Sequence, residues 1–131
     1  MLLVDSSAWV EILLGSTVKG MKAKELVASE PVFTASISLA EISYWCYCNK
    51  RQPEEDLALV RNTSEGLLQT RPAIEKRAGQ LKFELNNSLG IRGREIGLID
   101  CLIMAVGEES VLSILTTDKH FLKYSGKTIL L

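Results

Sequence analysis

The fold is decided by the stretch Met1-Leu2-Leu3-Val4-Asp5-Ser6-Ser7, in which an apolar run ends at an aspartate and two serines. A short apolar run of this kind is typical of a strand that is buried on both faces of a sheet. Apolar residues recur at helical spacing after it, so we expect Ser6 or Ser7 to cap a helix. Asp5 is thereby predicted at the carboxyl end of a central strand, where ligands bind in open α/β sheets.

Strands and helices are predicted to alternate over the rest of the chain. Strands are expected over residues 32–34, 67–68, 111–116 and 128–131. Helices are expected over residues 19–28, 36–49, 53–65 and 98–106, from Pro72 to a stop at Gly90, and as a short helix or turn over 119–124. Such alternation predicts an α/β fold with a mostly parallel central sheet.

Length and composition favour a single domain over residues 1–131. A chain of this length buries about two-thirds of the surface that it exposes when unfolded. The hydrophobic fraction of 47% argues against disorder. The formal net charge is −1, so the bulk charge does not indicate a nucleic-acid-binding protein, and such binding would depend on local basic residues or on metal.

The three cysteines, Cys46, Cys48 and Cys101, form no C-x-x-C pair. Their odd number suggests neither a disulfide framework nor a zinc site, so we expect buried thiols in a reducing cytoplasm. The first apolar run is too short for a signal peptide, and no segment approaches the length of a membrane span. We therefore expect a soluble cytoplasmic protein that makes no membrane contact.

Four acidic residues are predicted at one edge of the sheet. Asp5 and Asp118 follow strands, and Glu41 and Asp100 lie in the first turns of mostly apolar helices. Both kinds of position point to the carboxyl edge of a parallel sheet, so we expect the four carboxylates to converge on one crevice.

Carboxylates in a cluster repel one another and resist burial, and a divalent cation removes that penalty. Mg²⁺ and Mn²⁺ favour oxygen ligands, and a pair of such ions can hold a phosphodiester, activate water and stabilise the leaving oxygen. The sequence therefore predicts a phosphodiester hydrolase built from acids, which does not require the single histidine, His120.

Each acid also has a structural interpretation. Asp5 and Asp118 can cap helices, Glu41 forms a capping-box pattern with Ser38, and Asp100 is favourable at a helix N-terminus. We favour the interpretation as a cation-binding site, because four separate helix caps have no reason to fall at one edge of the sheet.

Four segments carry a resemblance to a known family. They are Leu3-Val4-Asp5-Ser6-Ser7, Ser38-Leu39-Ala40-Glu41-Ile42, Leu98-Ile99-Asp100-Cys101-Leu102-Ile103-Met104-Ala105 and Leu115-Thr116-Thr117-Asp118-Lys119-His120-Phe121. In order and spacing they resemble the PIN-domain family, and specifically its small ribonuclease toxins of VapC type. The resemblance covers nearly the whole chain, and its last two segments are the most specific.

The resemblance implies a three-layer α/β/α sandwich in which Asp5, Glu41, Asp100 and Asp118 bind Mg²⁺ or Mn²⁺. It implies a metal-dependent endoribonuclease that hydrolyses RNA and leaves 5′-phosphate and 3′-hydroxyl ends. It also implies a homodimer that is held inactive by an antitoxin protein.

Three other functions stay open. One is an RNA-processing PIN nuclease outside any toxin system, and another is a PIN-like scaffold that binds RNA or protein without cutting. The third is a phosphatase of haloacid-dehalogenase type, which needs a second aspartate where this chain has Ser7.

The residues around the acids have less specific interpretations. Ser6 and Thr117 are expected to orient carboxylates, or to act as ordinary caps. The aromatic run Tyr44-Trp45-Cys46-Tyr47 is expected to pack in the core, with a dimer or antitoxin surface as the alternative. Basic residues beside the acidic segments are candidates for holding the RNA backbone, with a solvated face as the default: Arg92, Arg94, Lys119, His120 and Lys123.

Overall fold

The computed structural model describes residues 1–88 and 95–131, and within them strands alternate with helices as predicted. The strands are β1 (Leu2–Val4), β2 (Val32–Ala35), β3 (Gly66–Leu68), β4 (Ser113–Thr116) and β5 (Thr128–Leu130). The helices are α1 (Ser6–Leu14), α2 (Val18–Ser29), α3 (Ser36–Cys48), α4 (Pro53–Thr63), α5 (Pro72–Ser88), α6 (Leu98–Ser110) and the 3₁₀ helix η1 (Lys119–Lys123).

The five strands form one sheet in the order β3-β2-β1-β4-β5, and every neighbouring pair is parallel. The chain builds one half of the sheet from β1 outward to β3, then crosses back through α5 and α6 to build the other half. The direction of winding therefore reverses between β1 and β4, which is where ligands bind in sheets of this kind. The predicted mostly parallel sheet is confirmed, and it is parallel throughout the described strands.

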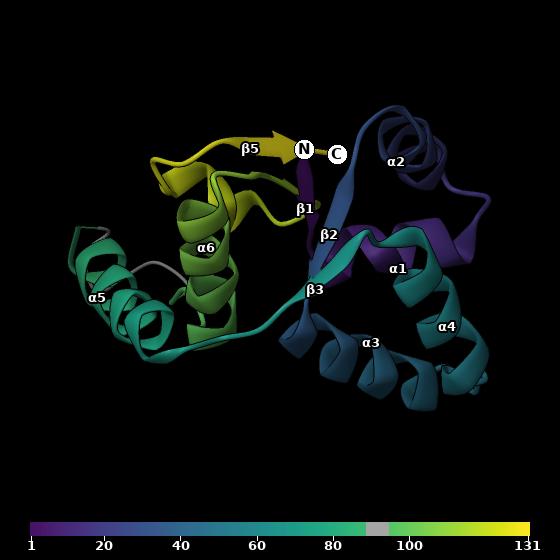
Figure 1. Cartoon of the computed structure of the whole chain (residues 1–131), viewed down its shortest axis with the longest axis horizontal. Coiled ribbons are helices and arrows are strands. Elements are labelled where there is room, and N and C mark those ends of the chain that lie inside the picture. The colour runs from purple at the N-terminus through teal and green to yellow at the C-terminus, as the bar shows by residue number, and fades with distance from the viewer. Residues whose placement is uncertain (89–94) are drawn as a thin grey trace.

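Helices cover both faces of the sheet, with α5 and α6 on one side and α1 to α4 on the other (Figure 1). Side chains alternate along β1, so that Leu3 packs in the cluster that contains α5 and α6. Leu2 and Val4 pack in the cluster that contains α1 and α3. All three are fully buried, which confirms the prediction of a strand covered on both faces and gives the three-layer α/β/α architecture.

Several predicted boundaries shift for local reasons. Asp5, rather than Ser6 or Ser7, is the N-cap of α1, because its carboxylate accepts from the Ser7 N–H. Helix α6 runs past the predicted end to Ser110, and Val111 then adopts a left-handed φ of 55°, which delays β4 to Ser113. The predicted stop at Gly90 lies outside the described residues.

The aromatic run Tyr44-Trp45-Cys46-Tyr47 in α3 is less buried than predicted. Tyr44 and Tyr47 are 73% and 70% exposed, so the expectation of core packing is wrong for both tyrosines. The cause is helical geometry, because Ile42 and Cys46 are four residues apart and share the core face. Cys48 is exposed as well, which contradicts the prediction that all three cysteines are buried.

Helices α1 and α2 pack closely where α2 carries a glycine. A Cβ atom added at Gly20 would overlap the carbonyl oxygen of Glu11 in α1, whereas one added at Gly79 in α5 would meet nothing within 4 Å. None of the helices in the described part of the chain is both long and apolar enough to cross a membrane.

We expect Gly20→Ala to lower the free energy of unfolding by on the order of 1–3 kcal/mol, because the helices must move apart. Gly79→Ala is the matched control, and it should raise stability by up to about 1 kcal/mol because alanine favours helix. Urea denaturation measures both. Equal stability of Gly20→Ala and the parent would contradict the close packing of α1 and α2.

Candidate active site

Asp5 lies at the point where β1 ends, beside the end of β4. The register pairs Val4 with Leu115, and the Asp5 N–H donates to the Leu115 carbonyl at 2.9 Å. This pairing places the Asp5 carboxylate against the hydroxyl of Thr116, the last residue of β4. Asp5 is only 4% exposed, so the site begins with an almost fully buried carboxylate.

Hydroxyl groups hold the Asp5 carboxylate in place. Its Oδ2 atom accepts from Ser7 Oγ at 2.7 Å and from Thr116 Oγ1 at 2.9 Å. Thr116 Oγ1 also accepts from the Asp118 N–H at 3.0 Å, and Ser7 Oγ accepts from the Thr117 N–H at 3.0 Å. The end of β1 and the segment after β4 are thus tied together by two side-chain hydroxyls.

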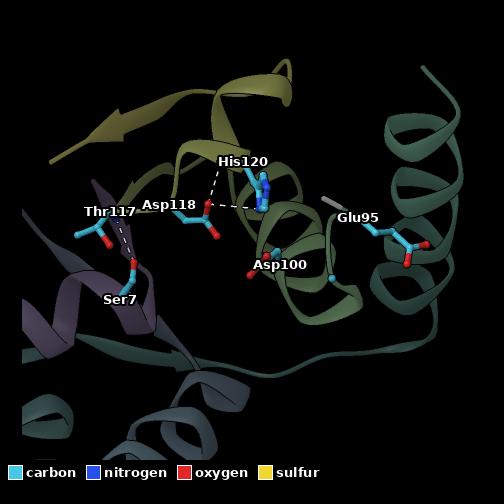
Figure 2. A pocket seen from close by; sticks show the side chains of 7 residues that line it. Ser7, Glu95, Asp100, Thr117, Asp118 and His120 are labelled. Atoms are coloured by element: carbon cyan, nitrogen blue, oxygen red, sulfur yellow. Dashed lines mark hydrogen bonds and ion pairs between the residues drawn. The ribbon is translucent and has the colours of Figure 1, made fainter. Parts of the chain in front are cut away.

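Asp118 and Asp100 come together on one side of this strand end, with His120 beside them (Figure 2). One ligand atom from each of these three residues lies within 4.8 Å of the others. Asp118 is the N-cap of η1 and accepts from the His120 N–H at 2.8 Å, which fixes the turn. Asp100 is in the first turn of α6. Among the described residues, Asp5 and Glu41 are not part of this tight group.

The beginning of α6 is positioned by α5. Asn86 binds the backbone of Ile96 in both directions, accepting from its N–H at 2.9 Å and donating to its carbonyl at 3.3 Å. Lys82 also donates to the Ile96 carbonyl, at 3.1 Å. Ile96 is fully buried, so the two residues before Leu98 are fixed and Asp100 is held at the sheet edge.

Glu41 approaches the same place from α3. Ser6 Oγ donates to its Oε1 atom at 3.1 Å. Burial, and then the negative charge of Asp5, raise the pKa of the Glu41 carboxyl from 4.5 to about 7. The Ser6 hydrogen bond lowers it, and the charge of Asp100 raises it further. The electrostatic effects of Asp5 and Asp100 on Glu41 join residues from three separate segments in one acidic region.

Asp100 and Asp118 open into a cleft of about 490 Å³, and Asp5 and Glu41 are not among its described lining residues. The described residues that line it are Ser7, Glu95, Gly97, Asp100, Thr117, Asp118 and His120. They include no lysine or arginine, and Glu95 turns away toward α5 (Figure 2), where it pairs with Lys82 at 3.5 Å. The described lining therefore combines carboxylate oxygens with one imidazole, a donor set that fits a divalent cation.

The structure bears on the structural interpretations of the acids. The Ser38–Glu41 capping box is wrong, because α3 begins at Ser36, its N-cap is Ala35, and Glu41 lies in the second turn rather than the first. Ser38 is instead fully buried, and its hydroxyl has no hydrogen-bond partner among the described residues. Asp5 and Asp118 do cap helices. At both positions the same side chain is a helix cap and also belongs to the acidic region.

Sequence reasoning missed two of the residues that organise the site. Thr116 and Ser7 hold Asp5, whereas Thr117 had been expected to orient a carboxylate. The available signal was the polar Thr116 directly after the apolar Ile114 and Leu115, at the residue that parallel pairing brings beside Asp5. Ser6 does bind Glu41, as expected. Among the predicted RNA-contacting residues, Lys119 and Lys123 are exposed, and Arg92 and Arg94 lie outside the described residues.

A model of the PIN domain matches residues 2–127. The chain belongs to the PIN domain family. The match covers nearly all of the sequence, and it confirms the resemblance carried by the four acidic segments. A search of curated proteins finds no match to this PIN domain.

Solved structures of VapC toxins and of toxin–antitoxin complexes are similar to this PIN domain. VapC20 of Mycobacterium tuberculosis, described as a toxin that cleaves the sarcin–ricin loop, has a TM-score of 0.76 and 18% identity, covering 100% of both chains. A chain of the VapBC2 complex of Rickettsia felis, bound to a promoter DNA fragment, has a TM-score of 0.75 and 18% identity, covering 99% of this chain and 98% of that one. A toxin–antitoxin complex from Klebsiella pneumoniae gives 0.74 and 18%, covering 98% and 96%. At these identities the similarity establishes the shared fold.

The raised pKa of Glu41 predicts a pH-dependent stability. Because its pKa of about 7 in the folded protein exceeds the ordinary 4.5, its contribution is fully present below pH 4.5 and is lost as the pH rises through 7. Glu41→Gln removes this loss and keeps an oxygen that can accept from Ser6. In EDTA at pH 8, it should unfold with a free energy on the order of 1–3 kcal/mol above that of the parent, with little difference at pH 4.5.

Urea denaturation at the two pH values measures this effect. Glu25→Gln is the control, because it removes a glutamate charge from an exposed position on α2. The control should follow the pH profile of the parent. If Glu41→Gln gains no stability over the parent at pH 8, burial and the charge of Asp5 do not raise the pKa of Glu41.

Proposed function

We propose that this chain is a metal-dependent endoribonuclease and the toxin of a toxin–antitoxin pair. The observation that carries the proposal is the convergence of carboxylates from four separate segments at the point where the sheet reverses its winding. The raised pKa of Glu41 supports it, because burial is its largest cause and the charges of Asp5 and Asp100 add to it. Membership of the PIN domain family and the similarity to VapC toxins support the same reaction class.

Asp5, Glu41, Asp100 and Asp118 are the proposed catalytic and cation-binding residues, with Mg²⁺ or Mn²⁺ as the cation. A bound divalent cation supplies a Lewis acid that stabilises charge on the phosphodiester and activates water for attack. Asp100 and Asp118 offer oxygens at the mouth of the cleft, and Asp5 adds a buried charge that Ser7 and Thr116 orient. Glu41 binds the cation directly or through water.

The proposed substrate of this site is RNA. The described lining of the cleft holds no lysine or arginine to face a phosphate backbone, so a cation held by the carboxylates would supply the positive charge there. The exposed Lys119 and Lys123 are the first and last residues of η1 and are proposed to hold flanking phosphates. Cleavage is expected to leave a 5′-phosphate and a 3′-hydroxyl.

An antitoxin partner and a homodimer belong to the proposal. Its support is that several similar structures are toxin–antitoxin complexes. The exposed Tyr44 and Tyr47 on α3 fit the alternative interpretation of the aromatic run, a surface that a partner covers. A small DNA-binding protein encoded in the neighbouring reading frame would favour a toxin over an RNA-maturation enzyme.

We expect Asp5→Asn to lose RNA cleavage by at least about 100-fold while its thermal unfolding stays close to that of the parent. Asparagine is as good an N-cap as aspartate, and its oxygen can still accept from Ser7 and Thr116, so mainly the charge is lost. The assay incubates total RNA and a single-stranded oligonucleotide with Mn²⁺ or Mg²⁺, and identifies product ends by primer extension. Addition of EDTA should abolish cleavage by the parent.

Glu25→Gln is again the matched control, because it removes one exposed negative charge from α2, which contributes no described residue to the cleft, and it should cut RNA at the parental rate. Cleavage by Asp5→Asn at the parental rate would show the assignment of the site to be wrong. A parent that binds no cation and cuts no RNA would favour the non-catalytic scaffold. Hydrolysis of a small phosphomonoester without RNA cleavage would favour the phosphatase.

A further inference from the structure

Among the described residues that line the cleft, His120 is the one whose side chain offers a nitrogen ligand. Its imidazole is 21% exposed, and one of its nitrogens lies within 4.8 Å of a carboxylate oxygen from each of Asp100 and Asp118. It is also the single histidine in the sequence.

We propose that His120 supplies a nitrogen ligand to a divalent cation held by Asp100 and Asp118, and that this ligand makes the site favour a transition-metal ion such as Mn²⁺ over Mg²⁺. The inference rests on the cation-dependent nuclease proposed above. It adds a nitrogen donor to a site otherwise built from carboxylates.

The distances suit a common ion. With ligand distances of about 2.1 Å, two ligands of an octahedral ion stand about 3 Å apart when adjacent and about 4.2 Å apart when opposite. His120 Nδ1 is 3.4 Å from Asp118 Oδ1, which is near the adjacent value. All three ligand atoms lie within 4.8 Å, so an adjustment of a few tenths of an ångström brings the set into range.

The backbone holds His120 beside the carboxylate before any ion binds. Asp118 caps η1, and its Oδ1 atom accepts from the His120 N–H at 2.8 Å. Phe121, the next residue, is fully buried and anchors η1 on the core. The imidazole therefore loses little conformational freedom when it takes up a ligand position, which favours binding.

The donor type decides the selectivity. Mg²⁺ is a hard ion that prefers oxygen and keeps several waters, so an imidazole nitrogen adds little to its binding. Divalent transition metals accept nitrogen together with oxygen, and their affinities rise along the series from Mn²⁺ to Cu²⁺. One imidazole among carboxylates therefore separates Mn²⁺ from Mg²⁺ more than a further carboxylate would.

The test uses the full chain without a histidine tag, loaded with Mn²⁺. Because the sequence contains one histidine, growth on [¹⁵N]histidine labels the imidazole of His120 alone. Pulsed electron paramagnetic resonance of bound Mn²⁺ should show a ¹⁵N coupling in labelled protein that is replaced by ¹⁴N in unlabelled protein. This readout requires neither RNA nor catalytic activity.

Calorimetric titrations with Mn²⁺ and Mg²⁺ give the selectivity. Groups that only support a ligand are worth about 10- to 100-fold in metal affinity, so His120→Gln should weaken Mn²⁺ binding at least about tenfold. It should change Mg²⁺ binding much less. Lys127→Gln, an exposed change shortly after the same helix, should leave both affinities unchanged.

The possible failures are distinct. If Mn²⁺ binds and the binding is lost in Asp100→Asn, but no ¹⁵N coupling is seen, His120 is only a hydrogen-bond partner of Asp118 and the inference is overturned. The acidic cation site then stands. If neither ion binds the parent, the proposed nuclease fails together with the inference. The coupling is measured on the parent, so a failure of His120→Gln to fold does not affect it.

Discussion

Negative charge gathered beside buried strand ends is the constraint on which the rest of the site depends. Asp5 is 4% exposed, and burial, followed by the charge of Asp5, raises the pKa of Glu41 to about 7. A fold of this size has a net stability of only about 5–15 kcal/mol, so such a concentration of charge is costly to maintain. The cost is consistent with a region whose natural state includes a cation.

The order in which the chain connects the strands brings these acidic residues to one edge of the sheet. The winding of the sheet reverses between β1 and β4, so the residues after both strands share one edge, and helices α3 and α6 deliver Glu41 and Asp100 to it. Hydroxyl groups then take the place of positive charge: Ser7 and Thr116 bind Asp5, and Ser6 binds Glu41. Neutral donors orient the carboxylates without neutralising them, which leaves their charge available to a bound ion.

Much of this arrangement could be predicted from the sequence, because it depends on local patterns. The apolar run before Asp5 predicts a central strand, and alternating strands and helices predict a parallel sheet with Asp5 and Asp118 at its carboxyl edge. Contacts between distant segments could not be predicted in the same way. The role of Thr116 depends on the register of β4 against β1, and the closeness of His120 to Asp100 depends on how α6 packs beside η1. The exposure of Tyr44 and Tyr47 could not be predicted either, because composition alone does not tell which face of α3 is covered.

The central claim is that the carboxylates at this sheet edge bind a divalent cation. The most direct test is a crystal structure of the protein soaked in Mn²⁺, with anomalous diffraction used to locate the ion. The account predicts an anomalous peak in the cleft within about 2.5 Å of carboxylate oxygens of Asp100 and Asp118, and none at this position in Asp100→Asn crystals. A fully occupied Mn²⁺ elsewhere on the molecule, with the cleft empty, would contradict it.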